Sequence, residues 1–182
     1  MSAKLTDKTS HAAVGSVSVS LLSRKGASGT YHLVKKLTTT SAGLAKATVQ
    51  PSVNSQCKFV FAATSAHAAA TSGIATVDVA QVVKAALTKT TTTQGGKVSV
   101  YGAVLPAATG ETVTLQLKVN GKWKTISSVK TKKQKLPNGA KTVGYIIGYS
   151  PITKGTQTLR VIRAADATNR GGASKKLTLK VT

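Results

Sequence analysis

The stretch that decides the fold is Val98–Ile126, VSVYGAVLPAATGETVTLQLKVNGKWKTI. Its second half contains the run Thr112–Val119, in which apolar and polar residues alternate with a period of two. Such alternation is typical of a half-buried β-strand. The run ends at Asn120-Gly121, which is a strong signal for a two-residue hairpin turn. We therefore predict two antiparallel strands here, at Thr112–Val119 and Lys122–Lys130.

The same alternation continues on both sides of this stretch, and we find no convincing amphipathic helix. The Ala-rich segment Ala62–Ala70 could be helical by composition, but its small polar residues and the following Thr71-Ser72-Gly73 favour a strand end and a loop. Pro137-Asn138-Gly139 predicts a further turn. The strands predicted in the second half of the chain, in addition to the two above, are Ala86–Thr92 as a ragged edge, Lys97–Val104, Val143–Tyr149, Gln157–Ala164 and Lys175–Val181. The sequence thus predicts an all-β protein.

The two halves of the chain also resemble each other. Val17–Leu21 aligns with Val113–Leu117, and Tyr31 falls opposite Trp123. Several short strands per half, with turns every 8–12 residues, are typical of a β-sandwich. We predict two tandem domains, residues 1–83 and 84–182, with a small interface between them around Gln81–Leu87.

The second half resembles bacterial immunoglobulin-like repeats, which are common in actinobacterial surface proteins and in phage structural proteins. The resemblance rests on the Val98–Ile126 stretch, on GTQTLRVIRAAD at Gly155–Asp166 and on GGASKKLTLKV at Gly171–Val181. It extends more loosely over residues 17–83. It implies two tandem immunoglobulin-like β-sandwich domains and carries no catalytic motif. The inter-sheet disulfide common in such domains has no counterpart, because Cys57 is the only cysteine.

The first domain departs from this pattern at its N-terminal edge. Aligning Val17 with Val113 places Met1 opposite Lys97, so the first domain has no counterpart of Lys84–Gly96. A sheet that lacks a strand exposes an edge with unpaired backbone groups. Either a partner completes the sheet by strand addition, or the chain is a piece of a longer repeat array.

The chain is strongly basic, with 26 Lys and Arg against 4 acidic residues and a formal net charge of +22. Residues 1–83 carry 8 basic and 2 acidic residues, and residues 84–182 carry 18 and 2. Only four of the cations are arginines, the residue best suited to bidentate recognition of phosphates and bases. A surface dominated by lysine favours diffuse attraction to a polyanion or an acidic protein surface. It argues against sequence-specific recognition of nucleic acid.

Seven lysines in the second domain are the candidate residues for binding a polyanion or an acidic partner. They are Lys122, Lys124, Lys130, Lys132, Lys133, Lys135 and Lys141, of which those from Lys130 onward are expected on a flexible basic loop. Trp123, between two of these lysines, could stack on a sugar or a base. The alternative is an aromatic side chain that half-covers the sandwich core, with Tyr31 as its equivalent in the first domain.

The sequence points away from enzymes and from metal or cofactor sites. Four carboxylates, one cysteine and three scattered histidines are too few for a calcium cage or a zinc module. No G-x-S-x-G, phosphate-binding loop or dinucleotide-binding pattern is present. We expect no catalytic residues, no metal and no cofactor, and we expect Cys57 to be buried. No segment has the length and apolarity of a signal peptide or a membrane span.

These observations lead to three functional hypotheses. The first is a phage virion decoration or accessory protein, located on the virion surface and docked on an acidic capsid or tail protein. The second is an extracellular spacer or adhesion segment of a bacterial cell-wall protein that binds anionic envelope polymers. The third is a non-specific nucleic-acid binder, against which the few aromatic and arginine residues argue.

Overall fold

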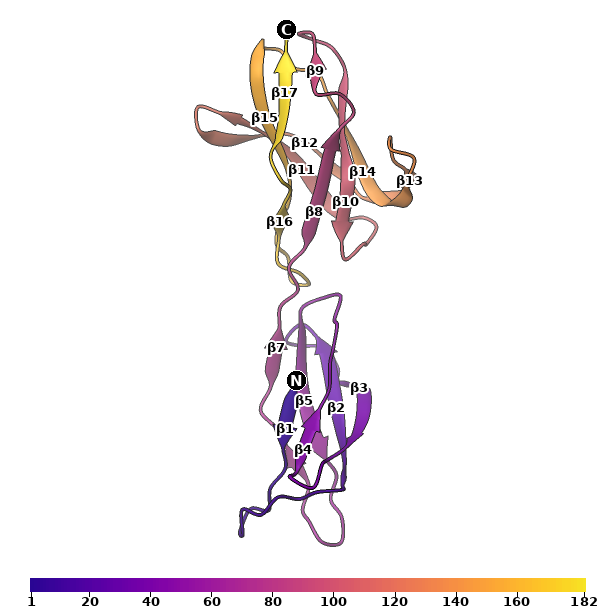
Figure 1. The fold of residues 1–182 in the computed structure, drawn as a ribbon, viewed down its shortest axis with the longest axis vertical. Coiled ribbons are helices and arrows are strands. Elements are labelled where there is room, and N and C mark those ends of the chain that lie inside the picture. The colour runs from indigo at the N-terminus through magenta and orange to yellow at the C-terminus, as the bar shows by residue number, and fades with distance from the viewer. The chain divides into compact units, whose positions relative to one another are not determined.

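The computed structural model describes residues 1–182, and every regular element in it is a strand (Figure 1). The prediction of an all-β protein is therefore confirmed. No helix is long and apolar enough to cross a bilayer. The chain divides into two compact units, Met1–Val79 (unit 1) and Ala80–Thr182 (unit 2). The boundary lies a few residues before the expected one, because Val82–Leu87 belongs to a sheet of unit 2.

Unit 2 contains two sheets that share one core. One sheet has the strand order β13-β14-β10-β8, and the other has the order β12-β11-β15-β17-β9, with β16 paired to β15. The strands are β8 (Val82–Leu87), β9 (Thr91–Thr92), β10 (Val98–Leu105), β11 (Thr112–Val119), β12 (Lys122–Lys130), β13 (Lys132–Lys135), β14 (Lys141–Tyr149), β15 (Gly155–Arg163), β16 (Gly172–Ala173) and β17 (Leu177–Val181).

The core of unit 2 consists of the inward-facing residues of both sheets. Val100, Tyr145 and Ile147 come from the first sheet, and Leu115 and Leu159 come from the second. Each of these side chains is buried, whereas the residues between them on the strands are mostly more exposed, as period-two alternation predicts. The hairpin predicted at Asn120-Gly121 is also present, with positive φ at both turn residues.

Two elements of unit 2 differ from the sequence prediction. The expected single edge strand Ala86–Thr92 is split into β8 and β9, which lie in different sheets, and β9 runs parallel to β17. The lysine-rich segment expected to be a flexible loop is strand β13, which pairs with β14 in register from Lys132 to Lys135. Its run of lysines shows no alternation of apolar and polar residues, so the pattern did not predict a strand. An edge strand tolerates these charges because one of its sides is open to solvent.

Unit 1 has a similar but smaller set of strands around a core that includes Leu21, Phe59 and Phe61. A two-stranded sheet pairs β1 with β4, and a second sheet has the order β3-β2-β5-β6, with β7 also paired to β5. The strands are β1 (Ser2–Lys4), β2 (Ser18–Lys25), β3 (His32–Thr38), β4 (Leu44–Lys46), β5 (Ser55–Phe61), β6 (Ala70–Thr71) and β7 (Ala75–Val77).

A buried threonine makes the same hydrogen bonds in each unit. In unit 2, Thr131 Oγ1 donates to Ala108 O at 2.6 Å and accepts from Glu111 N at 3.0 Å. In unit 1, Thr39 Oγ1 donates to Val14 O at 3.0 Å and accepts from Val17 N at 3.2 Å. Both threonines are almost fully buried, at 2% and 4% exposure. The two units therefore share a detailed motif that strand alternation alone does not reveal.

The register of the strands shifts the sequence alignment of the two units by two residues. Leu21 pairs with Phe59, and Leu115 pairs with Val161, so Leu21 corresponds to Leu115 and not to Leu117. The pairing with the next strand also shifts directly after Leu21 in one unit and directly after Leu115 in the other. A period of two cannot distinguish alignments that differ by two residues, which explains the error.

One pair of facing residues has its large and small members exchanged between the units. In unit 2, Gly102 on β10 pairs with the fully buried Tyr145 on β14. In unit 1, Leu5, just after β1, donates its N–H to the carbonyl of Gly43, just before β4, at 2.8 Å. A Cβ on Gly102 would lie 1.8 Å from Lys84 O, and a Cβ on Gly43 would lie 2.3 Å from Leu5 O. The large side chain at this place therefore comes from β14 in unit 2, and from the residue after β1 in unit 1.

Candidate anion-binding surface

Six of the seven candidate lysines lie on the outer strands β12 and β13 of the two sheets of unit 2, and Lys141 begins β14, the neighbour of β13. β12 is the edge of one sheet, β13 is the edge of the other, and the buried Thr131 is the single residue between them. The chain therefore passes from one sheet to the other at this point. All seven side chains are exposed: Lys122, Lys124, Lys130, Lys132, Lys133, Lys135 and Lys141.

The structure does not bring all seven lysines together. Lys122 and Lys130 are the two ends of β12, and at about 3.3 Å per residue they are about 26 Å apart along the strand. Lys122 and Lys124 therefore lie near the β11–β12 turn and are called the turn lysines below. The remaining five lie around β13 and are called the β13 cluster: Lys130, Lys132, Lys133, Lys135 and Lys141.

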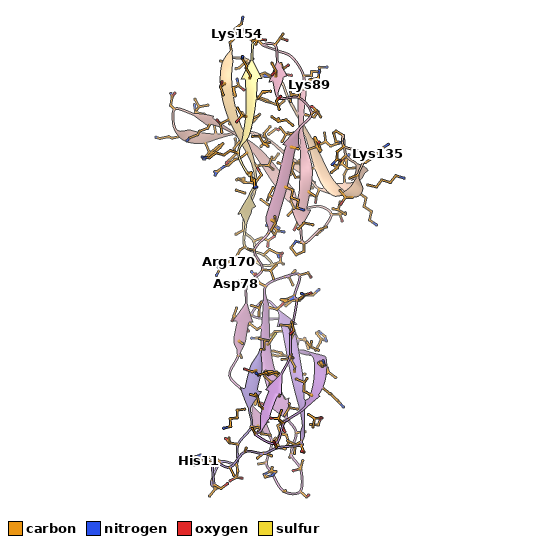
Figure 2. The ribbon with its side chains drawn as sticks, viewed as in Figure 1. His11, Asp78, Lys89, Lys135, Lys154 and Arg170 are labelled. Atoms are coloured by element: carbon orange, nitrogen blue, oxygen red, sulfur yellow. The ribbon has the colours of Figure 1, made fainter.

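Within the β13 cluster, two lysines lie directly opposite each other on paired strands. Lys135 pairs with Lys141 in the β13–β14 register, and Figure 2 shows Lys135 extending away from the ribbon. Like charges at directly opposed positions destabilise a strand pair. An anion that contacted both ammonium groups would remove this repulsion.

A shallow hollow of about 490 Å³ lies at this strand pair. Lys133, Lys135 and Lys141 line it together with Gln134 and Thr142. The Nε2 atom of Gln134 is buried and makes no hydrogen bond within the protein. Buried polar groups are normally paired, but an atom without solvent exposure offers no contact to a ligand, so the hollow presents the ammonium groups of its lysines. Nothing in the sequence singles out Gln134, because a neutral amide in a lysine run carries no signal of its own.

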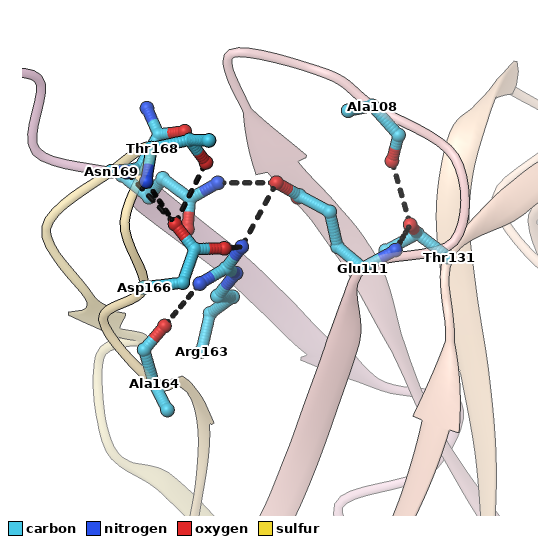
Figure 3. A network of polar contacts seen from close by, with 9 residues as sticks. Ala108, Glu111, Thr131, Arg163, Ala164, Asp166, Thr168 and Asn169 are labelled. Carbon is cyan, nitrogen blue, oxygen red and sulfur yellow. Dashed lines mark hydrogen bonds and ion pairs between the residues drawn. The ribbon is translucent and has the colours of Figure 1, made fainter. Parts of the chain in front are cut away.

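The two acidic side chains of unit 2 belong to a polar network around Arg163 (Figure 3). Arg163 is buried, forms an ion pair with Glu111 at 3.4 Å, and forms a second ion pair with Asp166. The hydrogen bond from Arg163, followed by those from Thr168, holds the pKa of Asp166 well below its usual range. Gln81 also donates to Glu111, at 2.6 Å.

This network decides the electrostatics of the lysine surface. Glu111 and Asp166 are the only carboxylate side chains in unit 2, and both are bound to Arg163. The lysines of unit 2 therefore have no acidic side chain of their own unit left to neutralise them. Their field remains available to an external anion.

Trp123 occupies a different position from the one expected for a core aromatic. It pairs with Lys118 on β11, and the Arg160 guanidinium lies over its ring at 4.1 Å from the centroid. Both neighbours face outward, so Trp123 lies on the outer face of its sheet and not against the core. Tyr31 has the same environment in unit 1, with Lys58 over its ring at 4.4 Å. One face of each aromatic ring is thus already covered by a cation of the protein.

Other reactive side chains do not assemble into a site. Cys57 is buried, and its sulfur lies 3.4 Å from Ser23 Oγ. No group of three or more His, Cys, Asp or Glu side chains lies close enough together to hold a metal ion. His67 lies 3.9 Å from Asp7 in an exposed part of unit 1, where hydrogen bonds from Ser10 lower the pKa of Asp7.

The arrangement is suited to binding extended negative charge, with the β13 cluster as its densest part. Known proteins give no further guide to a ligand: no model of a protein family matches this chain, and no curated protein matches it.

Proposed function

We propose that this is a non-enzymatic structural and binding protein that docks on an acidic surface through the β13 cluster. The observation that carries the proposal is the separation of charge within unit 2. Both carboxylate side chains are bound to Arg163, whereas Lys133, Lys135 and Lys141 line one exposed hollow.

The order of strands in unit 2 supports an immunoglobulin-like assignment. In such domains one sheet has the order A-B-E-D, and the other contains G-F-C with further strands beside C. The order β8-β10-β14-β13 corresponds to the first, and the order β17-β15-β11-β12 corresponds to the second. We propose that unit 2 is a complete immunoglobulin-like β-sandwich, and that unit 1 is a smaller version in which β8 and β13 have no counterparts among residues 1–79. Domains of this kind commonly serve as spacers and binding modules, which agrees with a structural role.

The setting that we propose is the surface of a phage particle, where unit 2 would bind an acidic capsid or tail protein. The immunoglobulin-like resemblance and the high positive charge support it. A bacterial wall protein that binds anionic envelope polymers would use the same surface, and the tests below separate the two.

Binding to immobilised poly-L-glutamate, duplex DNA and wall teichoic acid tests the docking surface. The informative variant is Lys133→Gln/Lys135→Gln, and Lys122→Gln/Lys124→Gln is its control because both remove two positive charges. Exposed ion pairs contribute about 0.2–1 kcal/mol each, so we expect the first variant to bind polyglutamate about fivefold to tenfold more weakly. The control should lose less than twofold. Equal losses in the two variants, or binding that does not weaken as salt is raised, would contradict the proposed surface.

The location of the protein tests the proposed setting. We expect stoichiometric amounts of the chain on purified phage particles, by intact-mass spectrometry and by antibody labelling in the electron microscope. Its presence only in washed bacterial envelopes, with tighter binding to teichoic acid than to polyglutamate, would replace the virion assignment with the cell-wall one. Preference for DNA over both would point to the nucleic-acid hypothesis.

A further inference from the structure

The outer edge of β1 in unit 1 has backbone groups that no neighbouring strand pairs. Met1 exchanges two hydrogen bonds with Ala47 on the β4 side, and Leu5 donates its N–H to the carbonyl of Gly43 there. In an antiparallel pair the backbone groups of successive residues point to opposite sides. The N–H and C=O groups of Ser2 and Lys4 therefore point away from β4, toward an edge that no other strand of unit 1 occupies.

An apolar groove runs beside this edge. It consists of two adjoining hollows of about 430 and 210 Å³, which share Ala3, Lys4, Phe59 and Ser72 among their lining residues. The groove thus lies between β1 on one side and β5 and the β5–β7 segment on the other. Met1 and Ala3, which pack against the core of unit 1, are only partly covered.

Unit 2 shows what fills the corresponding space. There β8 pairs with β10 and also packs against β15, β16 and β17. Val83 on β8 is buried at 5% exposure, and Ala85 and Leu87 pack against the core. The residues between them, such as Lys84, are directed outward.

Two details establish that the spaces correspond. Ala3 pairs with the buried Ala45 as Val100 pairs with the buried Ile147, which equates β1 with β10. On the other wall, the Ser72 hydroxyl accepts a hydrogen bond from the N–H of Phe59 at 2.9 Å. The Ser174 hydroxyl accepts one from the N–H of Val161 at 3.0 Å in the same way. The groove beside β1 in residues 1–79 therefore corresponds to the place that β8 occupies in unit 2.

We infer that unit 1 is a strand-acceptor site: an extended segment of a partner protein adds to β1 antiparallel and inserts small apolar side chains into the groove. Backbone hydrogen bonds to Ser2 and Lys4 would hold the segment, and alternate side chains would enter the core, as in known strand-addition complexes. This site lies within unit 1 and does not depend on the β13 cluster of unit 2.

Charge indicates the chemistry of that partner. Lys4 lines the groove, and unit 1 carries 8 basic and 2 acidic residues. In a segment with alternating small apolar and acidic residues, the apolar side chains fit the groove and the acidic side chains lie at its basic rim. The β8 strand of a second copy fits less well, because its central Lys84 would add a cation diagonal to Lys4, and because its removal would take Val83 from the core of unit 2.

The test uses fluorescein-labelled peptides and the full chain. The probe is Val-Val-Glu-Ala-Ala-Leu, which is the β8 sequence with Lys84 replaced by Glu, and its binding is followed by fluorescence anisotropy. We expect saturable binding, and several-fold weaker binding of the unmodified Val-Val-Lys-Ala-Ala-Leu peptide. A scrambled peptide of the same composition, without the alternation, should not bind.

The variant Lys4→Pro removes a donor from the open edge of β1 while leaving the bonds of Ala3 to β4. Loss of this one backbone hydrogen bond to the peptide should weaken peptide binding about tenfold. The charge-matched control Lys4→Gln should stay within threefold, and Ser2→Pro provides a second variant if Lys4→Pro alters the circular dichroism spectrum. The variant Lys133→Gln/Lys135→Gln should bind the peptide normally, so failure of the docking surface and failure of the acceptor site can be told apart.

Three results would overturn the inference. The first is no peptide binding at millimolar concentration, and the second is equal binding to Lys4→Pro and Lys4→Gln. The third is a dimer in light scattering that the peptide dissociates, since this would assign the groove to a second copy of the chain.

Discussion

Replacing Thr131 by valine removes two partly buried hydrogen bonds of unit 2 without opening a cavity. Valine has nearly the shape of threonine, and Thr131 is 2% exposed. The change leaves the carbonyl of Ala108 and the N–H of Glu111 without the partner that Thr131 Oγ1 now supplies at 2.6 and 3.0 Å. An unpaired buried polar group costs about 1–3 kcal/mol. We therefore expect Thr131→Val to lower the free energy of unfolding of unit 2 by about 2–4 kcal/mol.

Thr131→Ser is the matched control, because it keeps the hydroxyl and removes only a methyl group. Its expected cost is about 1 kcal/mol, the contribution of one buried methyl or methylene group. The expected order of stability is thus wild type, then Thr131→Ser, then Thr131→Val. Buried area alone predicts the opposite order for the two variants, since valine covers more apolar surface than serine.

Urea unfolding followed by tryptophan fluorescence measures this difference. Trp123 is the only tryptophan and lies in unit 2, so the signal reports that unit. With a slope of about 1.5 kcal/mol per molar urea, Thr131→Val should lower the transition midpoint by about 1.5–2.5 M. Thr131→Val at least as stable as Thr131→Ser would refute the assigned role of the hydroxyl.

Two further predictions concern other parts of the fold. Ser16 has a φ of 60°, and the equivalent residue of unit 2 is Gly110 with a φ of 84°. Glycine adopts positive φ without steric cost, so Ser16→Gly should stabilise unit 1 by about 0.5–1 kcal/mol in thermal unfolding. A destabilised variant would contradict this. The hydrogen bond from Arg163 lowers the pKa of Asp166 in the folded state, so its stabilising effect is present above the unfolded pKa of about 3.9 and is lost as pH falls below it. Asp166→Asn should therefore flatten the fall in stability of unit 2 below about pH 4, and an unchanged pH dependence would show that the ion pair contributes nothing.

The sequence predicted strand positions well where alternation was strong and a defined turn bounded it. The bounds of Thr112–Val119 and Lys122–Lys130 agree with β11 and β12 because Asn120-Gly121 fixes the hairpin between them. It failed at β13, where four residues contain three lysines and no apolar side chain. It also failed to separate β8 from β9, because local propensity does not say to which sheet a strand belongs.

The candidate site was predicted by composition and not by geometry. The sequence identified the exposed lysines, but it could not tell that the turn lysines and the β13 cluster lie at opposite ends of β12. Nor could it show that Arg163 binds both carboxylates of its unit, since Glu111 is 52 residues away in the chain. Contacts of that range depend on the pairing of whole strands, which local patterns do not encode.

The exchange of large and small residues between Gly102–Tyr145 and Leu5–Gly43 limits how the two units can recombine. A hybrid that paired the strand of Gly102 with the segment of Gly43 would leave a void where two glycines face each other. The reciprocal hybrid would force Leu5 and Tyr145 into a space that holds only one large side chain. Neighbouring domains of similar sequence are prone to misassembly during folding, and this mismatch penalises the cross-paired products. It also disfavours the exchange of single strands between the two units, whereas exchange of a whole unit keeps each large residue with its small partner.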